Sequence, residues 1–261
     1  MNIHFFKYQG TGNDFVILDN RKNDYDSLNK EQVAFLCDRR FGIGADGLMM
    51  LNLKSGYDFE MKYYNSDGTE SSMCGNGGRC LVRFAHHCGV HKSTYRFSAI
   101  DGDHEAEIAD DTIVNLKMKD VDKIEDYHGD AVLNTGSPHY VKMVGDVMEL
   151  DVFQKGKEIR YSHHFAKEGI NVNFVEQKEE DEIFVRTYER GVEDETLSCG
   201  TGVTASALVC YHNATGYNNV IVTTKGGKLN VEFDRINKGS YENIWLCGPA
   251  LKVFEGNMKI E

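Results

Sequence analysis

Two cysteines stand in nearly identical local sequences, Cys74-Gly75-Asn76-Gly77 and Cys199-Gly200-Thr201-Gly202, roughly half the chain apart. Apolar residues recur at helical spacing after each motif, so each cysteine is predicted to stand where a loop enters a helix. A helix N-terminus offers unpaired backbone N–H groups and a positive dipole end, which lower a thiol pKa below its usual value of about 8.5 and can hold a carboxylate. The two motifs therefore predict two reactive thiols, each beside an anion-binding turn.

This pair of thiols suits proton exchange at a stereocentre. If the two turns face each other, both helix ends can hold the α-carboxylate of an amino acid, with one sulfur on either side of its α-carbon. One thiolate then removes the α-proton, the other thiol returns a proton to the opposite face, and the fixed N–H donors stabilise the charge that develops. The sequence predicts an amino-acid racemase or epimerase that needs no cofactor, with Cys74 and Cys199 as its acid/base groups.

Other interpretations of these residues are weaker. A single Cys-Gly turn is more often structural, and we expect Cys37, Cys80, Cys88, Cys210 and Cys247 to be buried apolar side chains. A zinc site could be imagined from neighbouring thiols and imidazoles, but their spacing matches no standard ligand pattern: Cys74, Cys80, His86, His87 and Cys88. No Lys-Ser/Thr follows the glycines, which excludes a P-loop. We predict neither a metal nor a cofactor.

The elements that must position these thiols are predicted to be short strands and two clear helices. One helix begins near Gly77 and stops before Gly89, the other begins near Thr201, and a weaker helix covers residues 30–38. Strands are expected at residues 15–18, 48–53, 59–64, 112–118, 172–175, 183–188, 220–223 and 229–233. The repeated motif predicts an α+β fold of two similar strand-rich halves, each with a central helix and with the active site in the cleft between them. The expected bounds are 1–121, completed by 250–261, and 122–249.

Composition restricts the partners. The chain has 261 residues, a formal net charge of −12 and no clustered basic residues, so we expect neither nucleic acid nor an anionic membrane as a partner. No apolar run is long enough for a membrane span, and the N-terminus lacks the pattern of a signal peptide. A cytoplasmic protein is expected, and its seven cysteines are not expected to form a disulfide framework.

At these motifs the sequence resembles the diaminopimelate epimerase family over nearly its whole length, from Phe6 to about Val253. The order and spacing of the motifs carry the resemblance: Gly10-Thr11-Gly12-Asn13-Asp14-Phe15, Gly42-Ile43-Gly44-Ala45-Asp46-Gly47, Tyr64-Asn65-Ser66-Asp67-Gly68, Cys74-Gly75-Asn76-Gly77-Gly78-Arg79-Cys80, Gly136-Ser137-Pro138-His139, Asn171-Val172-Asn173-Phe174, Tyr188-Glu189-Arg190-Gly191 and Cys199-Gly200-Thr201-Gly202.

The resemblance implies epimerisation of LL-diaminopimelate to the meso form, for lysine and peptidoglycan precursors, by a homodimer. It implies that Gly75, Asn76, Gly200 and Thr201 hold the reacting carboxylate through backbone N–H groups. It also implies that Asn13, Asn65, Asn171, Glu189 and Arg190 bind the substrate, with Arg190 pairing the distal carboxylate. His139 and Glu189 are implied to support the site.

Three departures from the family pattern affect expected contacts. Ser137 stands where the family commonly has asparagine, Gly47 stands where glutamine is frequent, and the segment from Arg190 to Cys199 is one residue longer than usual. The alternatives are a proline racemase, which would need no group for a distal carboxylate, and a carboxylate- or peptide-binding module whose cysteines are inert.

Overall fold

The computed structural model describes residues 1–210 and 215–260 and divides the chain into two compact units. The first unit comprises Met1–Leu116 and Gly248–Glu261, and the second comprises Lys117–Cys247. The C-terminal segment therefore belongs with the N-terminal unit, because its strand β18 (Leu251–Lys259) pairs antiparallel with β1 (Asn2–Gly10).

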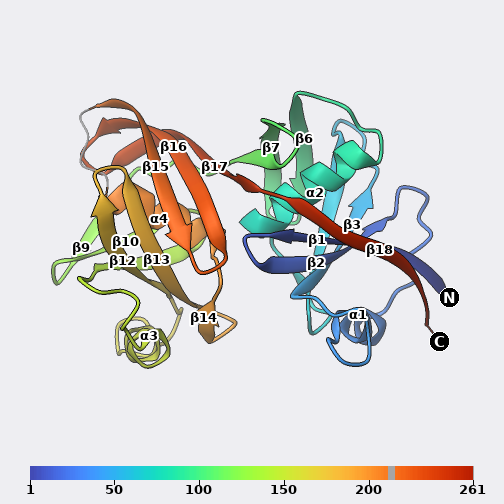
Figure 1. Cartoon of the computed structure of the whole chain (residues 1–261), viewed down its shortest axis with the longest axis horizontal. Coiled ribbons are helices and arrows are strands. Elements are labelled where there is room, and N and C mark those ends of the chain that lie inside the picture. The colour runs from blue at the N-terminus through green and yellow to red at the C-terminus, as the bar shows by residue number, and fades with distance from the viewer. Residues whose placement is uncertain (211–214, 261) are drawn as a thin grey trace. The chain divides into compact units, whose positions relative to one another are not determined.

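The first unit is a mixed sheet with two helices (Figure 1). Its strands pair in the order β18-β1-β2-β3-β4-β6-β7-β8, and the short β5 pairs with the other end of β4. The remaining elements are β2 (Asn13–Asp19), α1 (Lys30–Cys37), β3 (Gly47–Asn52), β4 (Phe59–Asn65), β5 (Glu70–Ser71), α2 (Gly75–His87), β6 (Thr94–Ala99), β7 (Gly102–Ile108) and β8 (Ile113–Lys117).

The second unit repeats this arrangement. Its strands pair in the order β9-β10-β11-β12-β13-β15-β16-β17, and the short β14 pairs with the other end of β13. Its elements are β9 (Glu125–Tyr127), β10 (Asp130–Asn134), β11 (Pro138–Met143), α3 (Val152–Arg160), β12 (Asn171–Glu179), β13 (Glu182–Glu189), β14 (Asp194–Thr196), α4 (Gly200–Cys210), β15 (Gly216–Thr224), β16 (Gly227–Asn237) and β17 (Ser240–Pro249).

The two units share the same alternation of strand directions. In each unit only the third and fifth of these pairings are parallel, namely β2–β3 and β4–β6 in the first and β11–β12 and β13–β15 in the second. A helix lies between the strands of every parallel pair, as a parallel connection requires. The predicted fold class, α+β with two similar strand-rich halves and a central helix in each, is confirmed.

The central helix of the first unit is enclosed by strands. Gly77 in α2 lies against Met49 and Phe15, and a Cβ built on it would meet the Met49 sulfur at 3.1 Å. On the neighbouring side, a Cβ on Gly78 would meet Leu116 of β8 at 3.3 Å. A Cβ at either position would require neighbouring side chains to give by a few tenths of an ångström, so the two glycines allow the first turn to lie close to strands on both sides.

The second central helix, α4, lies even closer to a neighbouring strand, β12. A Cβ on Gly202 in α4 would lie 2.3 Å from the Oδ1 atom of Asn173 in β12, well inside van der Waals contact. That oxygen accepts a hydrogen bond from the Thr187 hydroxyl at 2.9 Å, so it is fixed in place. The following residues of α4, Val203, Ala205, Ala207 and Leu208, are all buried.

The sequence identified both central helices and α1, but it missed α3. This helix contains Gly156 in its middle and has few apolar residues, and both features weaken the helical pattern in the sequence. The structure explains the glycine, because a Cβ there would lie 2.3 Å from the Cβ of Tyr188. The packing of α3 on β13 therefore overrides the local preference.

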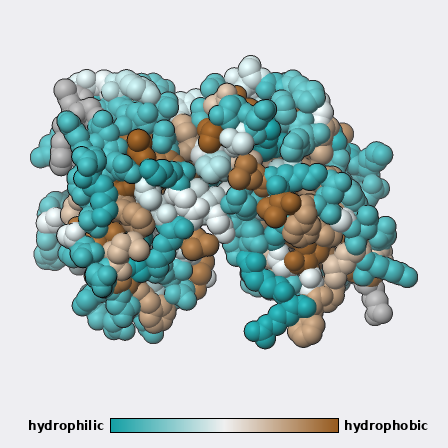
Figure 2. Space-filling view, in the orientation of Figure 1, coloured by the Kyte–Doolittle hydropathy of each residue, from teal (hydrophilic) through white to brown (hydrophobic). Residues whose placement is uncertain are grey.

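Hydrophilic residues cover most of the face that Figure 2 presents. None of the helices in the described part of the chain combines the length and the apolar character needed to cross a membrane.

Substitution of Gly202 by alanine tests the close approach of α4 to β12. We expect Gly202→Ala to lower the free energy of unfolding by about 1–3 kcal/mol, the usual cost of overpacking, even though alanine favours a helix. Gly145→Ala is the matched control, because nothing lies within 4 Å of a Cβ at that position. Urea unfolding of both variants measures the difference. Equal stability of the two would show that Asn173 gives way without cost.

Candidate active site

Cys74 occupies the N-cap position of α2. Its backbone is extended, with φ −95° and ψ 130°, and its carbonyl accepts the first helical hydrogen bond from Gly78 N–H at 2.7 Å. The N–H groups of Gly75 and Asn76 therefore belong to the first turn, where no helical acceptor exists. The half-buried thiol donates to the Asn13 side-chain oxygen, with 3.5 Å between sulfur and oxygen.

Cys199 occupies the same position before α4. Its carbonyl accepts from Val203 N–H at 2.8 Å, which again leaves the N–H groups of Gly200 and Thr201 in the first turn. The residue is buried, and its sulfur lies 3.5 Å from the Thr201 hydroxyl oxygen, where either group can be the donor. The Thr201 carbonyl is held by the Thr135 hydroxyl at 2.9 Å. Both motifs therefore place a sulfur beside a helix end that favours negative charge.

The side chains of Asn13 and Asn76 lie beside Cys74. The Asn76 amide nitrogen donates to the Asn13 oxygen at 3.4 Å, and the Asn13 nitrogen donates to Asp46 at 2.6 Å. Asn65 ends β4 opposite Gly47, which in turn pairs with Phe15. Since Phe15 stands two residues after Asn13, the strand register places Asn65 at the same end of the sheet as Asn13.

Asn171 and Arg190 come together in the second unit. The Asn171 oxygen accepts from the backbone N–H of Arg190 at 2.8 Å, and the exposed Arg190 guanidinium donates to the Glu168 carbonyl at 3.0 Å. The Ser137 hydroxyl joins them, since it accepts from Asn171 at 2.9 Å and from Arg190 at 3.3 Å. The shorter side chain that departs from the family pattern thus orders two predicted binding residues.

The two predicted supporting residues lie in different surroundings. Glu189 at the end of β13 accepts from the Thr196 hydroxyl at 2.9 Å. His139 is fully buried, and its Nδ1 atom accepts from the Asn173 amide at 3.1 Å. Burial, followed by the positive charge of Arg190, lowers the pKa of His139 to about 3, so the ring is neutral at pH 7.

The space at Gly47 is filled by aromatic and backbone atoms. A Cβ on this residue would lie 2.5 Å from the Tyr63 ring and 2.6 Å from the Tyr64 carbonyl oxygen. The Tyr63 ring also packs edge-on against Phe15, with 6.1 Å between centroids. A glutamine at position 47 therefore cannot be accommodated unless both the Tyr63 ring and the backbone at Tyr64 move.

The acidic residues of the longer segment before Cys199 are engaged in ion pairs. Glu195 pairs with Arg186 at 2.6 Å and with Lys225 at 2.9 Å, and Glu193 lies 3.3 Å from Arg160. These contacts fix β14 against β13, so the segment is tied to the sheet that carries Glu189.

Sequence reasoning assigned no role to three residues beside Cys74. Asp46 bonds Asn13, the Thr11 hydroxyl donates to Asn76 at 3.4 Å, and the buried Arg79 donates to Asn76 at 2.9 Å and to the Gly75 carbonyl at 3.3 Å. For Arg79 a signal existed, because it follows Gly75 by four residues and Asn76 by three, which is neighbour spacing on a helix.

Cys37, Cys80 and Cys88 lie away from the first residue of either central helix. Burial raises the pKa of the Cys37 thiol and of the Cys80 thiol to about 12, and that of the half-buried Cys88 to about 11. Cys247 is buried, and the side chain of Cys210 lies outside the described residues. Within residues 1–210 and 215–260, no three His, Cys, Asp or Glu side chains are grouped so that they could hold a metal ion.

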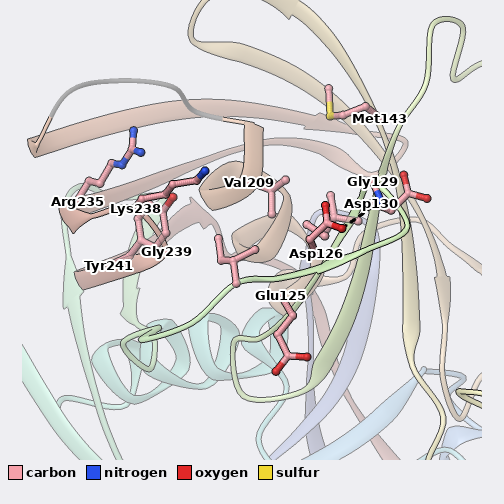
Figure 3. A pocket seen from close by; sticks show the side chains of 13 residues that line it. Glu125, Asp126, Gly129, Asp130, Met143, Val209, Arg235, Lys238, Gly239 and Tyr241 are labelled. Atoms are coloured by element: carbon pink, nitrogen blue, oxygen red, sulfur yellow. Dashed lines mark hydrogen bonds between the residues drawn. The ribbon is translucent and has the colours of Figure 1, made fainter.

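A cavity of 450 Å³ in the second unit is unrelated to these motifs (Figure 3). It lies between β9, β10, the end of α4 and the β16–β17 turn, with Asp126 on one side and Arg235 and Lys238 on the other. None of the predicted site residues lines it.

Comparisons with known proteins agree with the motifs. The family model for diaminopimelate epimerase matches residues 5–124 and 131–251. A diaminopimelate epimerase of Flavobacterium psychrophilum is 49% identical, over 96% of this chain and 98% of that protein. A diaminopimelate epimerase of Chlorobaculum tepidum is 40% identical, over 96% of this chain and 99% of that protein.

Solved structures share the fold at low identity. A PhzF-family phenazine biosynthesis protein of Bacillus anthracis has a TM-score of 0.78 at 14% identity, with full coverage of both chains. A hydroxyproline epimerase of Agrobacterium vitis has a TM-score of 0.68 at 13% identity, over 98% of this chain and 92% of that chain.

The low pKa of His139 predicts a pH dependence of stability. The folded pKa of about 3 lies below the unfolded value of about 6.5, so only the unfolded chain binds this proton between those values. Stability is therefore lost as the pH falls from 6.5 towards 3, by about 2 kcal/mol at pH 5. Urea unfolding at pH 7 and pH 5 should show this loss in the wild type, and a correspondingly smaller loss in His139→Gln. Equal losses would contradict a neutral His139.

Proposed function

Because the chain belongs to the diaminopimelate epimerase family, we propose that it converts LL-diaminopimelate to the meso form without a cofactor, with Cys74 and Cys199 as its two acid/base groups. One observation carries the mechanism: each unit places one cysteine at the N-cap of its central helix. The carbonyl of that cysteine accepts the first helical hydrogen bond, from Gly78 N–H at 2.7 Å in α2 and from Val203 N–H at 2.8 Å in α4. The proposed activity is the one for which both relatives are named, and each of them aligns with nearly the whole chain.

The proposed reaction exchanges the α-proton between two thiols. The thiolate of one cysteine takes the α-proton, and the electron pair of the broken C–H bond spreads into the α-carboxylate. The other cysteine then gives its thiol proton to the opposite face of the α-carbon. Backbone N–H groups of Gly75, Asn76, Gly200 and Thr201 would stabilise the carboxylate, because a helix start presents unpaired donors and a positive dipole end.

The remaining roles are proposed from the family resemblance, and the positions of the side chains support them. Asn13, Asn65 and Asn171 would bind polar groups of the substrate, and Arg190 would pair its distal carboxylate. The exposure of the guanidinium and its anchoring by Glu168 and Ser137 support that role, since a fixed arginine can offer two parallel N–H bonds to a carboxylate. Glu189 and His139 would hold the surrounding strands in place.

The biological setting is proposed from the family alone. It comprises a cytoplasmic homodimer that supplies precursors for lysine and peptidoglycan. Measurement of mass in solution by light scattering would test the dimer.

Solvent deuterium distinguishes two bases from one. In D₂O, product formed during less than one round of conversion should carry deuterium at the inverted carbon, while recovered substrate should carry almost none. The outgoing proton stays on the thiol of the original face, and the flat carbanion separates it from the other face. Mass spectrometry of the separated isomers measures this. Retention of the original hydrogen in the product would contradict the assignment of two opposed bases.

Removal of either sulfur should abolish epimerisation. We expect Cys74→Ala and Cys199→Ala each to lose at least about 10³-fold in turnover, because neither remaining thiol can serve both faces. Cys37→Ala is the matched control, since it removes a buried thiol outside the motifs. Chiral chromatography of the product measures turnover, and circular dichroism checks folding. Turnover near the wild-type value in either variant would exclude that cysteine as an acid/base group.

Loss of Arg190 should affect recognition of the diacid. Arg190→Met should lower kcat/KM for diaminopimelate by about 10³- to 10⁴-fold, because the distal carboxylate loses its partner. Alkylation of Cys74 and Cys199 should stay unchanged. Arg40→Met is the control, because it removes an exposed arginine elsewhere. If Arg190→Met processes diaminopimelate at the wild-type rate, another residue holds the distal carboxylate.

A further inference from the structure

The side-chain amide of Asn13 connects Cys74 to a carboxylate. Its nitrogen donates to Asp46 Oδ2 at 2.6 Å, and its oxygen accepts from the Cys74 sulfur at 3.5 Å. The same oxygen also accepts from the Asn76 nitrogen at 3.4 Å. All these residues belong to the first unit, so the arrangement is local to it.

The orientation of both amides is fixed chemically. An ionised carboxylate can only accept hydrogen bonds, so the nitrogen of Asn13 must face Asp46 and its oxygen must face Cys74. At the other end, the Arg79 guanidinium can only donate, and it donates to the Asn76 oxygen at 2.9 Å. The nitrogen of Asn76 must therefore face Asn13. Asp46 at one end and Arg79 at the other therefore determine that the oxygen of Asn13, and not its nitrogen, faces Cys74.

We propose that Asp46 is a positioning residue for Cys74: it holds the Asn13 oxygen toward the sulfur and thereby favours the thiol over the thiolate in the unliganded protein. A hydrogen-bond acceptor can bind S–H but has nothing to offer S⁻, so it stabilises the neutral form. The rotated amide would present N–H groups and stabilise the thiolate instead. The inference builds on the proposed acid/base role of Cys74.

Other charged or titratable groups also surround Cys74, and some of them favour the thiolate. The N-terminus of α2 and the buried Arg79 favour the thiolate. Cys80 on the same helix is buried with a raised pKa. Asp101, in the β6–β7 turn, accepts from the N–H of Met73 at 3.3 Å. Around Asp46 itself, Arg39 pairs with Asp46 at 2.7 Å and with Asp14 at 2.6 Å. The Asn13 oxygen therefore opposes the helix end and keeps a protonated sulfur accessible.

The test measures the reactivity of the Cys74 thiol rather than turnover. Wild type and Asp46→Asn are alkylated with iodoacetamide between pH 5.5 and 9.5, and the Cys74 peptide is quantified by mass spectrometry. In Asp46→Asn the Asn13 amide can rotate its nitrogen toward the sulfur. We expect the midpoint of Cys74 reactivity to move to lower pH and its alkylation on the acidic side of the midpoint to become about fivefold faster, the size of one hydrogen bond. The Cys199 peptide is the internal reference and should not change.

A second pair of variants separates an effect through the Asn13 amide from the direct effect of removing the negative charge of Asp46. Loss of a negative charge near Cys74 would also favour the thiolate, so Asp46→Asn is repeated in an Asn13→Ala background. If Asp46 acts through Asn13, the shift disappears there; a shift of the same size would overturn the proposal, as would no shift in the wild-type background. Arg39→Gln removes the ion pair but leaves the bond between Asp46 and Asn13, and the midpoint should stay within a few tenths of a pH unit.

Two controls keep the result interpretable. The Asp46 side chain is 44% exposed, so the substitution should leave the fold intact, and thermal melting checks this; Asp46→Ser is the alternative should Asp46→Asn not fold. The solvent-deuterium experiment tests the epimerase mechanism independently. A failure of the thiol shift with two-base exchange intact would reject only the role of Asp46.

Discussion

The geometry of both cysteines depends on one packing constraint, the close approach of a helix start to buried strands. A sulfur at the N-cap is useful only if the first turn behind it cannot move. In α2 this turn is held by Gly77 against Met49 and Phe15, and in α4 by Gly202 against Asn173. A Cβ at Gly202 would lie 2.3 Å from the Asn173 oxygen, so something must shift there, whereas a Cβ at Gly77 would require Met49 to give by a few tenths of an ångström. Gly77 and Gly202 of the two motifs therefore serve the packing of the helix, apart from any role in the proposed binding of a carboxylate.

The repeated strand order explains why the chain shows its duplication only at the cysteines. A strand tolerates many apolar side chains as long as they alternate, so the paired strands of the two units need share no recognisable sequence. The helix starts that follow the cysteines allow fewer substitutions, because Gly77, Gly78 and Gly202 lie close to side chains of neighbouring elements. Strand β18 joins the first unit out of sequence order: it comes from the end of the chain and pairs along β1 from Asn2 to Gln9.

The sequence was informative where residues act locally and uninformative where they act through distant partners. Helix starts at Cys74 and Cys199 could be predicted because capping depends on neighbouring residues. The role of Ser137 could not, because its partners Asn171 and Arg190 stand 34 and 53 positions away. Asp46 lies in the motif at residues 42–47, but its bond to Asn13 joins residues 33 positions apart and does not follow from the motif. Gly156 argued against α3 because the ring of Tyr188 that requires it lies on another element.

The repeat also limits where any difference between the two thiols can arise. Both sulfurs stand at the start of a central helix, and the carbonyl of each cysteine accepts the first helical hydrogen bond. The backbone N–H groups and the helix dipole are therefore placed similarly relative to both sulfurs. Their side-chain neighbours differ. Cys74 faces an amide oxygen that Asp46 keeps from rotating, whereas Cys199 faces the Thr201 hydroxyl, which can donate as well as accept. A hydroxyl can accept a hydrogen bond from a thiol and donate one to a thiolate, whereas a fixed amide oxygen can only accept one from a thiol. The proposed two-base exchange needs one thiol and one thiolate at its start, and the two cysteines differ in the side chains beside each sulfur and in burial, since Cys74 is half-buried and Cys199 is buried.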